Sequence, residues 1–155
     1  MRGQRVNGRS ATILGGLAAF LLAHAAYVAA FAVNGVSLRW MGMAAVPVVG
    51  IAIAIGTWLA SHIPPELILP VRLYIFVISG TVIAAFGTRG KDGSLLILIG
   101  ALLFFLSDLS VASLRLVQTE FPSYVWGLPL YYAGQLCLAL SVSQSPSGRL
   151  CTARP

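Results

Sequence analysis

Five stretches of about 20 mainly apolar residues dominate this chain and leave little sequence between them. The hydrocarbon core of a bilayer is about 30 Å thick, a distance that a helix of about 20 residues crosses. In lipid, only helices and closed barrels satisfy all their backbone hydrogen bonds, and runs of this length favour helices. We therefore predict an all-α fold, a polytopic integral membrane bundle of about five transmembrane helices. The predicted spans cover about residues 13–33, 41–60, 67–86, 94–113 and 126–143.

The scarcity of charge supports this prediction. The 155 residues are 58% hydrophobic and only 9% charged, whereas a soluble domain is about half apolar and about a quarter charged. So few charged groups cannot cover a water-facing surface. The formal net charge is +6, but the basic residues fall in the tails and between the apolar runs. That distribution is typical of a membrane protein facing anionic lipid, and it argues against a nucleic-acid partner.

Short polar links join the predicted spans, so consecutive helices are expected to be antiparallel neighbours. Residues 1–12 form a polar, basic N-terminal tail, residues 13–143 the transmembrane domain, and residues 144–155 a C-terminal tail that we expect to be disordered. The first apolar run is longer than the apolar core of a signal peptide, so we expect it to be retained as a span. The basic residues divide evenly between the two sides of the membrane and therefore predict no orientation.

One carboxylate, Asp108, lies well inside an apolar run. An ionised group at such a position costs about 2.5 to 3.5 kcal/mol on insertion scales, so its presence needs a reason. One interpretation is structural: the carboxyl group hydrogen-bonds a neighbouring helix and holds the bundle together. The other is chemical: Asp108 is a proton donor or acceptor that desolvation keeps neutral. The residue by itself does not separate these two hypotheses.

Several other polar residues are predicted to gather near Asp108. Because the helices alternate in direction, the third span begins, the fourth ends and the fifth begins on the same side of the membrane. At a rise of about 1.5 Å per residue, the whole group falls in one leaflet, about 12 Å or less from the interface. Interfacial snorkelling accounts for the two arginines in the group better than for Asp108 or Gln135. The candidates are Arg72, Tyr74, Asp108, Arg115, Tyr131, Tyr132 and Gln135.

The first span carries an aromatic stripe, in which Phe20, His24, Tyr27 and Phe31 recur along one helical face. We expect this face to point into the bundle, because His24 near the membrane midplane would otherwise meet lipid. The simpler interpretation is a buried histidine bonded to a neighbour, and the functional one is that His24 and Tyr27 bind substrate. No cysteine or carboxylate accompanies His24 in its span, so a metal site is unsupported and no cofactor is indicated.

Three blocks of sequence carry a resemblance to a known family. Residues 20–31 follow the pattern His-x-x-Tyr-x-x-x-Phe, and Pro70-Val-Arg-Leu-Tyr74 opens a later helix. The most specific block pairs Ser107-Asp108 in one span with Tyr-Tyr-x-x-Gln, ending at Gln135, in the next. On these blocks, which together cover about residues 17–142, the chain resembles the YhhN-like family, the lysoplasmalogenases.

The resemblance implies a function. Family members are polytopic proteins that cleave the vinyl ether bond of lysoplasmalogens to a fatty aldehyde and a glycerophospho-alcohol. It implies a membrane lysophospholipid as substrate and Asp108 as the acid or base. We further infer that Arg72 or Arg115 contacts the phosphate, and that Tyr131, Tyr132 and Gln135 position water or the ether oxygen.

The alternative, from a different class, is a non-catalytic membrane protein such as a small transporter subunit or a partner-binding bundle. A transporter of the usual kind would show internal repeats and broken helices at corresponding positions, and the sequence shows neither. A structural remnant without activity is a further alternative.

One feature of the family pattern is missing from the sequence. Family members carry a second acidic residue, in a Gly-Asp motif on a helix upstream of the His-x-x-Tyr block. Here that block begins near the N-terminus, so the chain corresponds to the C-terminal helices of the pattern. A start site placed too late, a fragment and a decayed paralogue all stay open, and the chain would be inactive if the chemistry needs two carboxylates. The arginine-rich basic set indicates a GC-rich bacterial genome, and we expect a location in the bacterial inner membrane.

Overall fold

The computed structural model describes residues 2–114 and 123–144, which form five α-helices and a short 3-10 helix. The predicted all-α bundle is confirmed, and within the described residues there is no strand. Each helix begins and ends within a few residues of a predicted span, except that the first helix begins well before its predicted span. The helices are α1 (Arg2–Asn34), α2 (Leu38–Ala60), α3 (Ile68–Gly87), α4 (Ser94–Ala112) and α5 (Ser123–Gln144), with η1 (Pro65–Leu67) leading into α3.

Four of the described helices are long and apolar enough to cross a membrane, namely α2, α3, α4 and the part of α5 from Val125 to Gln144. In α1 the described apolar segment is Ala18–Asn34, which is shorter than a full span. The helix itself continues through residues 2–12, which the sequence analysis assigned to a polar tail. Residues 145–155, predicted to be disordered, lie outside the described residues. The chain is an integral membrane protein.

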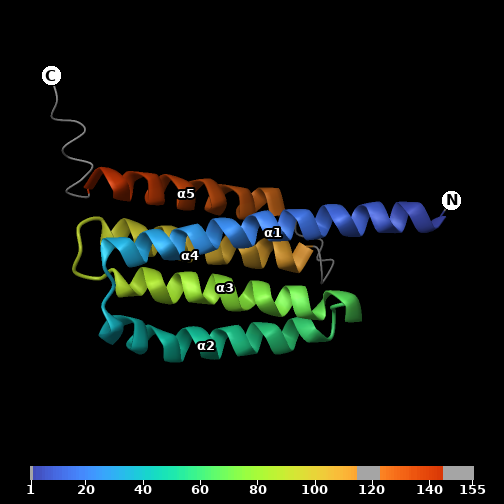
Figure 1. Cartoon of the computed structure of the whole chain (residues 1–155), viewed down its shortest axis with the longest axis horizontal. Helices are drawn as coiled ribbons and strands as arrows, with labels where there is room; N and C mark the ends of the chain where they lie inside the picture. The colour runs from blue at the N-terminus through green and yellow to red at the C-terminus, as the bar shows by residue number, and fades with distance from the viewer. Residues whose placement is uncertain (1, 115–122, 145–155) are drawn as a thin grey trace, which may run out of the picture.

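The helices lie side by side along the long axis of the molecule, and consecutive helices run in opposite directions (Figure 1). The closest backbone packing joins α4 to α5, whereas α1, α2 and α4 each pack against α3. In Figure 1, α2 and α5 lie on opposite sides of the bundle, with α3, α4 and α1 between them. Since α1 packs its backbone most closely on α3, it reaches α4 and α5 mainly through side chains.

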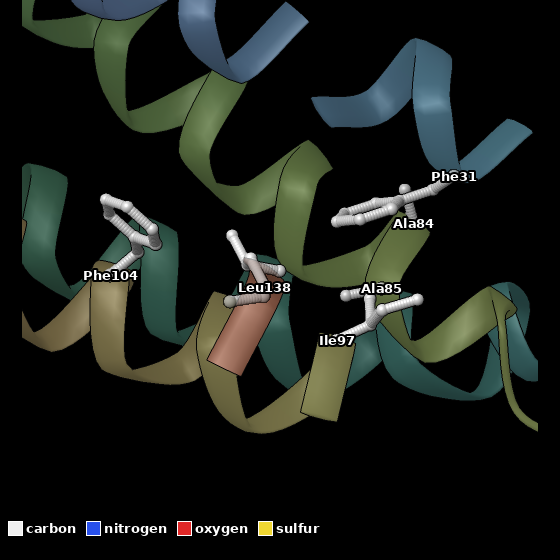
Figure 2. Packing of buried hydrophobic residues seen from close by; sticks show 7 residues of the cluster. Phe31, Ala84, Ala85, Ile97, Phe104 and Leu138 are labelled. Carbon is white, nitrogen blue, oxygen red and sulfur yellow. The ribbon is translucent and has the colours of Figure 1, made fainter. Parts of the chain in front are cut away.

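A cluster of buried hydrophobic side chains joins α1, α3, α4 and α5 (Figure 2). Phe31 of α1 lies over the small side chains of Ala84 and Ala85 in α3, which leave room for its ring. Phe20 and Tyr27 of α1 pack against the edge of this cluster. The prediction that the aromatic stripe of α1 faces the bundle is therefore confirmed.

Two glycines set the close approach of α4 and α5. A Cβ atom at Gly100 would lie 2.8 Å from Cγ of Leu138 and 3.1 Å from the carbonyl oxygen of Gly134, and one at Gly134 would lie 3.1 Å from the carbonyl oxygen of Gly100. Small residues of this kind let transmembrane helices approach closely. In the same interface, the Ser107 hydroxyl donates to the carbonyl oxygen of Gly127 at 3.0 Å. This contact fixes the rotation of α4 about its axis and thereby the direction of the next residue, Asp108.

We predict that Gly100→Ala destabilises the bundle, because the added methyl group meets the branch point of Leu138 and the backbone carbonyl oxygen of Gly134, as well as the end of the Leu138 side chain. Overpacking of this kind costs about 1–3 kcal/mol. The measurement is the unfolding temperature in detergent, followed by circular dichroism. The matched control is Gly50→Ala on α2, where a Cβ atom meets nothing within 4 Å and the better helix former is neutral or slightly stabilising. Equal effects from the two substitutions would contradict the assignment of a glycine contact.

Candidate active site

Ionisable side chains from α1, α3 and α4 meet inside the bundle. His24 and Asp108 are almost fully buried, with exposed fractions of 3% and 4%. Nε2 of His24 lies 3.7 Å from Oδ2 of Asp108. The Tyr74 hydroxyl, on α3, hydrogen-bonds the Asp108 carboxyl group. Three residues that are far apart in the sequence therefore share one buried polar cluster.

The hydrogen-bond partner of His24 leaves its second ring nitrogen facing Asp108. Nδ1 of His24 lies 3.0 Å from the carbonyl oxygen of Phe20, and because a carbonyl only accepts, Nδ1 must carry the hydrogen. In a neutral imidazole the other nitrogen, Nε2, is then an acceptor. It faces Oδ2 of Asp108, an atom with no hydrogen-bond partner among the described residues. At 3.7 Å the two atoms are close but not hydrogen-bonded. A proton on either atom would make them a donor and an acceptor, as Asp–OH facing neutral imidazole or as carboxylate facing imidazolium.

A pocket of about 250 Å³ lies against this cluster, between α1, α4 and α5. That is the volume of roughly eight molecules of liquid water. One part of its wall is apolar and the rest is polar. Among the described residues that line it, His24 is present and Asp108 is not, so the carboxyl group lies behind the imidazole ring. The lining residues are Gly16, Ala19, Phe20, Ala23, His24, Tyr27, Phe104, Tyr131 and Gln135.

A chain of hydrogen bonds forms the polar wall of this pocket. The Tyr27 hydroxyl on α1 donates to Oε1 of Gln135 on α5 at 3.2 Å. Nε2 of Gln135 in turn donates to the Tyr131 hydroxyl oxygen, also at 3.2 Å. These bonds connect α1 to α5 across the pocket, where the backbones of the two helices stay apart.

Phe104 is the central aromatic contact of the site, and the sequence analysis did not single it out. Its ring centroid lies 6.0 Å from that of His24, 5.9 Å from that of Tyr27 and 5.2 Å from that of Tyr131. It lies one helical turn before Asp108 and so shares its helix face, which is the signal that could have identified it. Its ring excludes water from the side of the pocket that faces α4.

The structure brings together some of the predicted site residues and separates others. It joins the stripe of α1 to the group on α3, α4 and α5, which the sequence analysis treated as two features. Arg72 is exposed and does not line the pocket. Tyr132 is 66% exposed, and its ring contact with the site among the described residues is with Tyr131, at 5.4 Å between ring centroids. Arg115 lies outside the described residues.

Within the described part of the chain, no three histidine, cysteine or carboxylate side chains are grouped as a metal site requires. The chemistry that these residues offer is proton transfer by the His24–Asp108 pair and hydrogen bonding by the tyrosines and Gln135.

Comparison with known proteins places the chain in a family. The family model described as "YhhN family" matches residues 5–142. The chain belongs to the YhhN family. The match covers the stripe of α1, Tyr74, Asp108 and the residues of α5 that line the pocket, so the resemblance drawn from the sequence blocks is confirmed.

Two curated proteins similar to this YhhN chain are both named lysoplasmalogenase TMEM86B. The protein from Sus scrofa is 32% identical over 136 residues, which are 86% of this chain and 55% of the relative. The protein from Homo sapiens is 32% identical over 139 residues, which are 88% of this chain and 56% of the relative. The chain thus spans about half the length of the curated relatives it matches. No solved structure matches it.

We predict that Tyr74→Phe destabilises the protein, because it removes a hydrogen-bond donor from a buried carboxyl group. Leaving such a group short of a partner costs about 1–3 kcal/mol. The measurement is a double-mutant cycle in which Tyr74→Phe is made in the wild type and in an Asp108→Leu background. The cost should be much smaller in the second background, where no carboxyl group remains. An equal cost in both would show that the tyrosine hydroxyl does not act through Asp108.

Proposed function

We propose that this chain is a lysoplasmalogenase-like membrane hydrolase, which cleaves the vinyl ether bond of lysoplasmalogen-type lysophospholipids to an aldehyde and a glycerophospho-alcohol. The observation that carries the proposal is the buried His24–Asp108 pair, which can bind and release a proton and lies against a pocket. The names of the similar proteins support the same reaction. The integral membrane fold supports an amphiphilic substrate that resides in the bilayer.

The reaction needs an acid at its first step. A proton is added to the alkenyl carbon that does not bear the oxygen, and the carbon–oxygen unit becomes an oxocarbenium ion. Water then adds to the positive carbon and loses a proton, which gives a hemiacetal. The hemiacetal collapses with cleavage of the carbon–oxygen bond to glycerol, whose oxygen takes up a proton, and the aldehyde is released. One water is consumed, and the acid regains its proton.

The geometry supports particular roles for these residues in the reaction. Asp108 and His24 hold the proton together, and His24 is the member of the pair at the pocket surface. Tyr74 holds the carboxyl group in place from α3. An ionised pair is costly in an apolar site, whereas a pair that shares one proton between neutral groups avoids much of that cost. The pair is therefore suited to give a proton and take it back without a lasting buried charge.

The pocket supports an amphiphilic ligand. Gly16, Ala19 and Ala23 line it with small apolar groups suited to a hydrocarbon chain, while Tyr131 and Gln135 offer hydrogen bonds to oxygen atoms. A phosphate contact by Arg72 or Arg115, and a role for Tyr132 in positioning water or the ether oxygen, are further parts of the proposal. On the arginine-rich basic set we also propose the bacterial inner membrane as the location.

We predict that Asp108→Asn lowers aldehyde release by at least about 100-fold, because positioned acid–base groups contribute about 100- to 10,000-fold. The measurement uses purified protein in lipid nanodiscs, supplied with 1-alkenyl-lysophosphatidylethanolamine. The matched control is Asp92→Asn, which makes the same chemical change at an exposed position between α3 and α4 and should keep full activity.

Two results of this experiment would contradict the proposal. Equal release by wild type and Asp108→Asn would remove the His24–Asp108 pair from the reaction. No release by any folded form would favour the non-catalytic membrane protein.

A further inference from the structure

The hydrogen-bond chain across the pocket does not use the hydroxyl hydrogen of Tyr131. The Tyr27 hydroxyl donates its hydrogen to Oε1 of Gln135, and Gln135 donates from Nε2 to the oxygen of Tyr131. The oxygen of Tyr131 is therefore occupied as an acceptor, while its own hydroxyl hydrogen is not used in either bond. Tyr131 lines the pocket, so the hydroxyl can turn its hydrogen toward a ligand there.

One tyrosine hydroxyl hydrogen is left unused whichever way the Gln135 amide is oriented. The orientation of such an amide is assigned from its hydrogen-bond network. A primary amide offers the two tyrosines one acceptor oxygen and one donor nitrogen. In either orientation, one tyrosine donates to the amide and the other accepts from it. One tyrosine hydrogen is always left over, and both Tyr27 and Tyr131 line the pocket. The orientation in the structure assigns that hydrogen to Tyr131.

The surroundings of Tyr131 hold its ring in place. Its ring meets Phe104 edge-on at 5.2 Å and Tyr132 edge-on at 5.4 Å between ring centroids. Such edge-to-face contacts restrict the ring, so the main freedom left to the hydroxyl is rotation of its hydrogen. Because Gln135 occupies one side of the oxygen, that rotation is restricted as well. The hydrogen is thus directed before any ligand arrives.

We propose that Tyr131 is the substrate-binding hydrogen-bond donor of this pocket, that Gln135 is its positioning residue, and that the ligand must present an ether or hydroxyl oxygen to it. The identity of the ligand as a lysophospholipid rests on the proposed function, but the binding does not require hydrolysis. A donor left unpaired in an apolar pocket is penalised. A ligand without an acceptor oxygen at that position is therefore rejected, as in other sites built to hydrogen-bond a substrate oxygen.

The experiment measures binding without reaction. The probe is 1-O-alkyl-lysophosphatidylethanolamine, whose saturated ether lacks the double bond that the acid would protonate. Two analogues test the two candidate oxygens: one has sulfur in place of the ether oxygen at glycerol C1, and the other lacks the hydroxyl group at C2. Wild-type protein in nanodiscs should bind the parent probe about tenfold more tightly than one of these analogues, the change expected for one hydrogen bond to a ligand.

The variants then assign that preference to a residue. Tyr131→Phe should weaken binding of the parent probe about tenfold. It should also abolish the preference, because without the hydroxyl donor the parent probe no longer forms the hydrogen bond that the analogue lacks. Tyr27→Phe is the matched control, since it removes a hydroxyl from the same pocket but leaves the donation from Gln135 to Tyr131, and the preference should remain. Gln135→Met should reduce the preference, and with the alkenyl substrate it should raise KM more than it lowers kcat.

The ratio of the affinities for the parent probe and an analogue is informative even if a variant folds less well, because both affinities are measured on the same protein. Loss of the preference in Tyr131→Phe but not in Tyr27→Phe supports the proposal, whether or not the wild type releases aldehyde. A preference that survives Tyr131→Phe overturns it, even if Asp108→Asn abolishes hydrolysis. A wild type that binds all three probes equally also overturns it.

Discussion

A carboxyl group inside an apolar bundle needs partners, and the arrangement of this protein follows from how Asp108 finds them. The carboxyl group contacts Tyr74 on α3 and faces His24 on α1, so one residue of α4 connects three helices. Because Nδ1 of His24 is hydrogen-bonded to the Phe20 carbonyl oxygen, the other ring nitrogen faces the carboxyl oxygen. The result is a buried pair of titratable groups that belongs to no single helix.

The pocket results from unequal packing around this pair. Gly100 and Gly134 bring α4 and α5 into backbone contact, whereas α1 packs most closely on α3 and leaves a gap toward α5. Aromatic rings and the bonds between Tyr27, Gln135 and Tyr131 bridge that gap without filling it. The glycine contact and the open pocket are thus two consequences of where small and large side chains lie on the helices.

The two interpretations of Asp108 that the sequence left open do not exclude each other. Its contact with Tyr74 ties α4 to α3, which agrees with the structural interpretation. The oxygen that faces His24 has no hydrogen-bond partner among the described residues, and the chemical interpretation is the one that the proposed function adopts. The YhhN family match covers all of these residues, although the chain spans about half the length of its curated relatives.

The sequence by itself determined the all-α membrane fold, the approximate bounds of the helices, the buried face of α1 and the position of Asp108 inside an apolar helix. These properties are local, because they depend on the length of apolar runs, on helical spacing and on the cost of a carboxylate in lipid. Only the tertiary structure decided that His24 faces Asp108, that Gln135 binds Tyr27, and that Arg72 stays outside the pocket. Those contacts depend on how far each helix is rotated and how closely it approaches its neighbours. Rotation and approach are set by contacts such as those of Gly100 and Ser107, between helices that are separate in the sequence.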